Sequence, residues 1–157
     1  MRDLLGELAA LVGESEGAWR SEHGRWELYQ QAAVSPQARE LLRRAIPLEP
    51  VPAMASAVVV MLLERSDRGR RRELVGLLDP AVREFPERRV REIEILESIE
   101  GSNGALGADV EAIETWSDWL QLKVVGVTRD ERVLSVLAER GRTKKIRRLA
   151  REALAGQ

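Results

Sequence analysis

The stretch Val51–Leu63, with the sequence VPAMASAVVVMLL, is the most apolar part of the chain. Between Ala53 and Leu63 it has no charged side chain, and its one polar side chain is Ser56. An amphipathic surface helix would show a polar face within two turns, and this segment shows none. A helix of this length spans about 16 Å, too short for a hydrocarbon core of about 30 Å. The stretch therefore predicts a helix buried on all sides within a helical core.

The composition of the chain is typical of a helical protein of ordinary domain size. Its 157 residues are 44% hydrophobic and 32% charged, with few aromatic side chains and no cysteine. A chain without cysteine has no disulfide, thiol nucleophile or thiolate metal ligand, which fits a reducing compartment. Asp3 and Gly6 interrupt the first residues too early for a secretion signal. We therefore expect one all-helical domain, residues 1–157, in the cytoplasm.

Apolar residues recur at helical spacing along almost the whole chain. The segment 119–127 also alternates as a strand would, but a strand without a partner is unstable, so we expect it to be helical. The pattern predicts helices with short connections over residues 4–12, 16–33, 35–46, 53–66, 70–78, 88–99, 109–124, 130–139 and 143–154.

Three prolines form the clearest boundary in the chain. Pro47, Pro50 and Pro52 make a rigid connector, because proline fixes its own φ angle and disfavours helix in the residue before it. We expect residues 1–50 to form an N-terminal helical cap and residues 51–157 to form helical repeats.

Other local signals predict breaks within the helical pattern. Gly24 weakens the helix around it, and Phe85-Pro86 marks a further break. The glycine-rich stretch 101–107 (GSNGALG) is an expected loop, after which Asp109 caps the next helix. Ser117-Asp118 is a second potential N-cap that would divide this helix into two.

The last third of the chain contains a recurring pattern. Residues 120–141, LQLKVVGVTRDERVLSVLAERG, are a run of small and aliphatic residues, a glycine, an aspartate and a helix of the VLxxLAxxG type. Residues 143–154 would open a further unit, and the central block shows the same rhythm of helices separated by aspartates. Over residues 55–154 the chain resembles HEAT-repeat proteins. The resemblance implies an all-α solenoid of stacked antiparallel helix pairs, to which an irregular helical bundle is the alternative.

Two tryptophans are candidates for contact with a partner. Trp19 and Trp26 fall on one stripe of the expected helix 16–33, whose other faces are charged. They either pack this helix onto the central one or form an exposed anchor for a partner or a second copy, since interface hot spots favour tryptophan.

Positive side chains gather in two stretches, 68–72 (RGRRR) and 140–151 (RGRTKKIRRLAR). They form either a solvated basic surface or a site for phosphate or for an acidic partner. The net charge of −1 gives the whole chain no attraction to nucleic acid, and residues 140–151 have no aromatic side chain to stack on bases. The basic candidates for partner binding are Arg70, Arg71, Lys144, Lys145, Arg147, Arg148 and Arg151.

No residue pattern indicates catalysis, a cofactor or a metal. His23 is the only histidine, and the acid at helical spacing from it is Glu27. Neighbouring carboxylates such as Glu111 and Glu114 occur on any polar helix face, whereas acid–base catalysis needs two carboxylates in unlike environments. The loop 101–107 has no lysine to bind phosphate as a P-loop does.

We therefore expect a non-enzymatic helical-repeat protein that acts as a protein-protein interaction module or adaptor. Its partner would be another protein or a second copy of this chain, and no membrane is expected. The alternative is a nucleic-acid-binding helical domain that uses the basic C-terminal helix. A third hypothesis is a DNA-glycosylase-like helical-repeat protein, because solenoids of that kind use a basic groove with tryptophan and aspartate. The residues of these types are Trp116, Asp118, Trp119 and Arg148.

Overall fold

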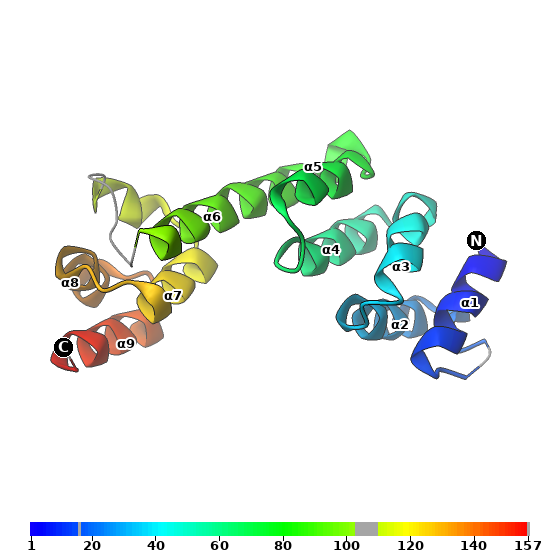
Figure 1. Cartoon of the computed structure of the whole chain (residues 1–157), viewed down its shortest axis with the longest axis horizontal. Coiled ribbons are helices and arrows are strands. Elements are labelled where there is room, and N and C mark those ends of the chain that lie inside the picture. Colours follow the sequence, from blue (N-terminus) through cyan, green and yellow to red (C-terminus); the bar gives the residue numbers. More distant parts are fainter. Residues whose placement is uncertain (16, 103–109, 157) are drawn as a thin grey trace. The chain divides into compact units, whose positions relative to one another are not determined.

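The computed structural model describes residues 1–15, 17–102 and 110–156, and every regular element in them is helical (Figure 1). Within these residues the chain forms nine α-helices and four short 3-10 helices, with no β-strand. The expected all-α class is confirmed, and the segment 119–127 is helical as predicted. No helix in the described part of the chain has the length and apolar character needed to span a membrane.

The chain folds into two compact units, Met1–Val90 and Arg91–Gln157. Helix α6 (Glu84–Gly101) crosses this boundary, so its first turns belong to the first unit and the rest to the second. The proline connector lies inside the first unit, so residues 1–50 share a compact unit with the helices that follow them.

The first unit is organised around α2 and α4. Helix α2 packs against α1, α3 and α4, and α4 also packs against α5 and η3. Leu8, Leu28, Leu42, Val59 and Leu63 are almost completely buried in this core, each stabilising the fold by about 1.5–3 kcal/mol. Before α6, the elements are α1 (Arg2–Val12), η1 (Ala18–Arg20), α2 (Glu22–Val34), α3 (Arg39–Ala45), η2 (Ile46–Leu48), α4 (Pro52–Leu63), α5 (Arg68–Gly76) and η3 (Pro80–Val82).

Helix α4 corresponds to the central apolar stretch, and the prediction that it is buried on all sides is wrong. Val58, Val59 and Leu62 face the core, but Val60 is only half-buried and Ala53 is exposed. An apolar helix need not be surrounded, because folded proteins expose much apolar surface when they have too few elements to cover it. Helix α4 therefore keeps an apolar side that no other element of its unit fully covers.

The expected helix 16–33 is interrupted. Trp19 lies in η1, the backbone is extended at Ser21 with φ −90° and ψ 159°, and α2 then begins at Glu22. The Ser21 hydroxyl accepts a hydrogen bond from the backbone N–H of Gly24 at 3.0 Å, as an N-cap does. The prediction that Trp19 and Trp26 share one helical stripe is therefore wrong.

The expected break at Phe85-Pro86 is also wrong. Helix α6 begins at Glu84 and continues through Pro86 to Gly101. Proline is tolerated in the first turn of a helix, because the N–H groups there have no intrahelical acceptor. Pro86 therefore lies near the start of a helix and does not end one.

The second unit consists of the end of α6 followed by four elements: η4 (Val110–Thr115), α7 (Asp118–Val127), α8 (Glu131–Arg140) and α9 (Lys144–Ala155). Helices α8 and α9 form a hairpin with a short turn, and α9 also packs against α7. Ile113, Leu134 and Ile146 lie in the core of this unit. Ser117 N-caps α7, so the proposed division of that helix is confirmed. Asp109 and most of the loop 101–107 lie outside the described residues.

Candidate binding surfaces

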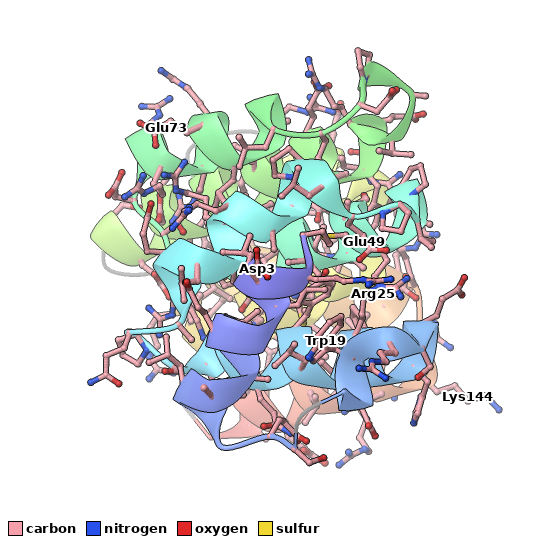
Figure 2. The ribbon with its side chains drawn as sticks, turned by 90° about the vertical axis from the view of Figure 1, so that its right-hand side faces the viewer. Asp3, Trp19, Arg25, Glu49, Glu73 and Lys144 are labelled. Atoms are coloured by element: carbon pink, nitrogen blue, oxygen red, sulfur yellow. The ribbon has the colours of Figure 1, made fainter. Side chains whose placement is uncertain are left out.

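A buried ionic cluster fastens the proline connector to α2. The carboxylate of Glu49 accepts hydrogen bonds from Nε and Nη2 of Arg25 at 3.0 and 3.2 Å, and from the Tyr29 hydroxyl at 2.8 Å. It also accepts the backbone N–H of Val51 at 3.0 Å. The Glu49 side chain is fully buried, and Figure 2 shows Arg25 beside it.

The hydrogen bonds to Glu49 stabilise the protonated forms of Tyr29 and Arg25. Burial raises the pKa of Tyr29, and the hydrogen bond to Glu49 raises it further. The hydrogen bond to Glu49 also raises the pKa of Arg25. A carboxylate has about four acceptor sites, and four donors already occupy those of Glu49. The hydrogen bonds of Glu49 therefore hold Arg25 and Tyr29 in position.

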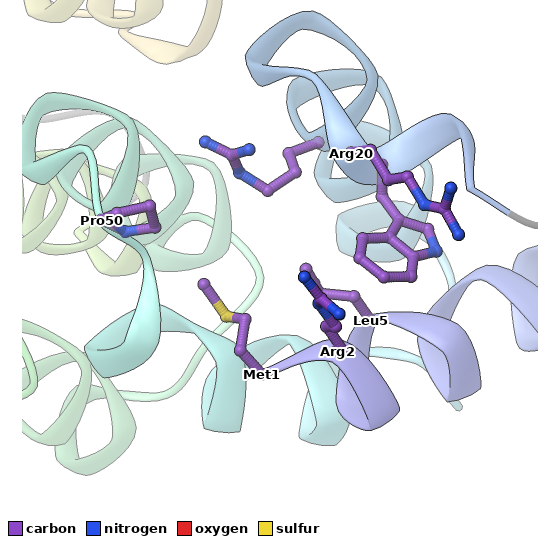
Figure 3. A pocket seen from close by; sticks show the side chains of 7 residues that line it. Met1, Arg2, Leu5, Arg20 and Pro50 are labelled. Atoms are coloured by element: carbon purple, nitrogen blue, oxygen red, sulfur yellow. The ribbon is translucent and has the colours of Figure 1, made fainter.

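Beside this cluster the first unit contains a hollow of about 530 Å³, which we call the arginine hollow. Figure 3 shows Met1, Arg2 and Leu5 on one side of it and Arg20 on the opposite side. Among the described residues, three arginines and no acidic residue line this space. The lining residues are Met1, Arg2, Leu5, Trp19, Arg20, Arg25 and Pro50.

Neither predicted tryptophan is fully exposed, since Trp19 and Trp26 are both half-buried. Trp19 lines the arginine hollow, and its Nε1 atom is buried with no hydrogen-bond acceptor among the described residues. Trp26 lies on α2, after the break at Ser21. The two indoles thus belong to different elements, and the structure links Trp19 to a hollow that the sequence did not reveal.

A second feature of the first unit is an open groove of about 410 Å³, which we call the Phe85 groove. Phe85 is 45% exposed, and the guanidinium carbons of Arg88 and Arg89 lie 5.1 and 5.6 Å from the centre of its ring. The Ser56 hydroxyl on α4 donates a hydrogen bond to the carbonyl of Val82 at 3.2 Å and so joins the two sides of the groove. The lining residues are Ala53, Ser56, Ala81, Val82, Glu84, Phe85 and Arg88.

The basic stretch 68–72 is not a uniform basic surface. Asp67 N-caps α5 by accepting the backbone N–H of Arg70. The Arg70 side chain pairs with Glu73 at 2.9 Å and lies 3.9 Å from Glu40. Arg71 is only 4% exposed, and its Nε donates to the carbonyl of Leu63 at 3.0 Å. Arg71 therefore serves the packing of α5 on α4 and does not offer a charge to a partner.

The basic C-terminal helix α9 also uses two of its arginines internally. Arg151 donates to the carbonyl of Ala138 at 3.1 Å, and Arg147 donates to the carbonyl of Gly141. These acceptors lie at the C-terminal end of α8, where helix carbonyls have no intrahelical donors and a positive charge is stabilised. The two side chains thus fasten α9 to α8.

Acidic residues pair with three further arginines of the basic stretch 140–151. Arg140 pairs with Glu114 at 2.7 Å, and Arg142 pairs with Asp118 at 2.6 Å. Arg148 pairs with Glu152 at 2.7 Å. Among the described residues, Lys144 and Lys145 remain exposed without an acidic partner, and Figure 2 shows Lys144 extending into solvent. Three arginines of the stretch are therefore paired with acids, two of them from other elements and one from α9 itself.

The residues weighed for catalysis are not assembled into a site. The His23 side chain is 81% exposed and lies 3.2 Å from Glu27, as its helical spacing predicts. No group of three or more side chains in residues 1–15, 17–102 and 110–156 could hold a metal ion. Trp116 is buried in the core of the second unit, while Asp118 pairs with Arg142 at the surface.

Sequence reasoning missed Arg2, Arg20, Arg25, Glu49 and Phe85. These residues come from distant parts of the chain, and none is distinguished locally by a motif. A partial signal was the aromatic Phe85 in a charged stretch. No family model, curated protein or solved structure matches this chain, so its function is argued from its own residues.

Proposed function

We propose that this protein is a non-enzymatic interaction module or adaptor, built from stacked helix pairs of the HEAT-like kind, and that the Phe85 groove contacts its partner. The observation that carries the proposal is the exposure of Phe85, which leaves 45% of its surface in solvent inside a groove lined by both apolar and polar side chains. Such exposure costs stability, because burying a phenylalanine is worth about 1.5–3 kcal/mol.

The chemistry of the groove is that of an interface centre. Aromatic and arginine side chains are enriched there and contribute most of the binding free energy. Arg88 lies over the ring of Phe85, where it could also pair with a carboxylate of the partner. A groove of this kind offers both apolar contact and a charge that orients the partner.

The exposed side of α4 extends this surface. Ala53, Ser56, Ala57 and Val60 share one side of α4, opposite the buried Val58 and Leu62. Small side chains allow a second helix to pack closely against this side. We therefore propose that the partner presents an amphipathic helix, with its apolar stripe on α4 and Phe85 and a carboxylate near Arg88.

The second unit supports the repeat part of the proposal. Helices α8 and α9 form a hairpin, and α7 packs against α9, as consecutive helices do in stacked helical pairs. The predicted bounds 130–139 and 143–154 match those of α8 and α9 to within a residue at each end.

The test replaces Phe85 with a photoreactive phenylalanine analogue in cells that produce the protein. We expect irradiation to yield a discrete cross-linked adduct whose amount falls when Arg88→Glu is added. The matched control carries the analogue at Leu48, an apolar side chain of the same unit that is 49% exposed.

Equal adducts from both positions, or none from position 85, would contradict the proposal. An adduct of twice the chain mass would show that the partner is a second copy of this protein and would contradict the proposal of a helix from another protein. The non-enzymatic part would be overturned by a steady-state activity that disappears on substitution of particular polar residues.

A further inference from the structure

We propose that the arginine hollow binds a small organic anion, with a phosphate or carboxylate group carried on an apolar or aromatic body. This inference is independent of the interaction function, because the hollow shares no lining residue with the Phe85 groove. It rests on the charge, the donors and the shape of the hollow.

The charge of the hollow is compensated only in part, since Glu49 pairs with Arg25 alone. Among the described residues, neither Arg2 nor Arg20 has a hydrogen-bonded or ion-paired carboxylate. Other arginines of the first unit do, as Arg43 does with Glu40. An anion bound in the hollow would be attracted by both of these positive charges.

Arg25 supplies a donor whose position is already determined. Its Nε and Nη2 atoms are bound to the buried Glu49, and its side chain is only 11% exposed. Its Nη1 atom has no acceptor among the described residues. An arginine held on one edge loses little side-chain entropy when its other edge binds a ligand oxygen.

The rest of the lining is apolar. Met1, Leu5, Trp19 and Pro50 give the hollow an apolar wall, and its volume of about 530 Å³ is typical of small-ligand sites. An apolar wall beside guanidinium groups suits a ligand that carries its anionic group on an apolar body.

The test titrates isotope-labelled full-length protein with four probes and follows the side-chain N–H resonances by NMR. The probes are phenyl phosphate, benzoate, inorganic phosphate and benzyl alcohol. We expect saturable shifts of the Trp19 indole resonance, assigned with Trp19→Phe, on adding phenyl phosphate or benzoate. The tighter of the two identifies the preferred anionic group. Benzyl alcohol has the aromatic body without the charge and should cause no saturable shift.

Substitutions locate the site. We expect Arg2→Gln and Arg20→Gln each to weaken binding about tenfold, as loss of a charge-assisted hydrogen bond does. The matched control is Arg72→Gln, which removes an exposed positive charge on α5 and should leave affinity unchanged. The proposal is overturned if neither aromatic anion gives a saturable shift. It is equally overturned if the three variants bind alike, or if benzyl alcohol binds as tightly as the anions.

Discussion

Gly141 stands at the turn between α8 and α9. A Cβ atom on this residue would lie 2.5 Å from the carbonyl oxygen of Leu137 and 2.7 Å from Cγ2 of Ile146. Its φ of −53° is allowed for any residue, so backbone conformation does not require glycine here. The glycine of the VLxxLAxxG pattern is required because a side chain would clash with its neighbours. The pattern was visible in the sequence, but its steric cause was not.

We predict that Gly141→Ala lowers the free energy of unfolding by about 1–3 kcal/mol, because the backbone oxygen of Leu137 cannot move aside cheaply. The control is Gly126→Ala in α7, where an added Cβ would meet nothing within 4 Å. This control should be neutral or stabilising by up to about 1 kcal/mol. Urea unfolding measures both, and equal stability of the two variants would refute the steric argument.

Single arginines show why residue type alone does not assign function. Arg71 and Arg151 look like surface cations in the sequence, yet both donate to backbone carbonyls of a neighbouring helix. Lys144 and Lys145 keep their charges in solvent. The difference depends on which neighbouring carbonyls lack donors, and those carbonyls belong to other elements.

At the scale of elements, local signals predicted most helix ends to within two residues. The first helix ends at residue 12 as predicted, where Gly13 follows with a φ of 77°, and the predicted N-cap Ser117 precedes α7. The effect of Pro86 was predicted wrongly because proline disrupts a helix at an interior position but is tolerated in the first turn. The break before α2 was not predicted because the sequence does not show which serine is an N-cap. The structure shows it, since the Ser21 hydroxyl accepts a hydrogen bond from the backbone N–H of Gly24.

The Glu49 cluster holds the connector before α4 against α2, and Tyr29 makes this contact sensitive to pH. The raised pKa of Tyr29 means that the folded state holds the phenolic proton more tightly than the unfolded state. We predict a full contribution to stability below about pH 10, the ordinary tyrosine pKa. The contribution falls by up to about 1.4 kcal/mol per pH unit above that value, until the folded-state pKa is reached.

Urea unfolding between about pH 8 and about pH 11 measures this loss. Tyr29 is the only tyrosine, so tyrosinate absorbance reports this one residue and should appear together with unfolding. Tyr29→Phe is the control and should lack this part of the pH dependence. Tyrosinate absorbance in a fully folded protein at the ordinary pKa would refute the prediction.

At the scale of the molecule, the distribution of charge bears on the nucleic-acid hypothesis. The stretch 140–151 contains no acidic residue in the sequence. In the fold, however, Glu114 and Asp118 form ion pairs with its Arg140 and Arg142. Nucleic-acid affinity depends on cations that are free to replace counterions at phosphates. Paired arginines in a chain of net charge −1 meet this requirement poorly.

We therefore predict that labelled DNA and RNA bind weakly at low salt and not at moderate salt, as measured by fluorescence anisotropy. The double variant Glu114→Gln and Asp118→Asn should bind more tightly, because it releases Arg140 and Arg142. Tight, salt-sensitive binding by the unmodified protein, abolished by Lys144→Glu and Lys145→Glu, would favour the nucleic-acid hypothesis instead.

The sequence by itself determined the helical class, most helix ends and the absence of cysteine chemistry, because periodicity, caps and composition are local properties of a chain. Only the tertiary structure decided which side of α4 is covered, which arginines are paired, and that Arg2, Arg20 and Arg25 line one hollow. These features join residues far apart in the chain. They are stabilised by contacts between distant residues, which local patterns do not encode. One example is the pair of hydrogen bonds that the Glu49 carboxylate accepts from Arg25 and Tyr29 on α2.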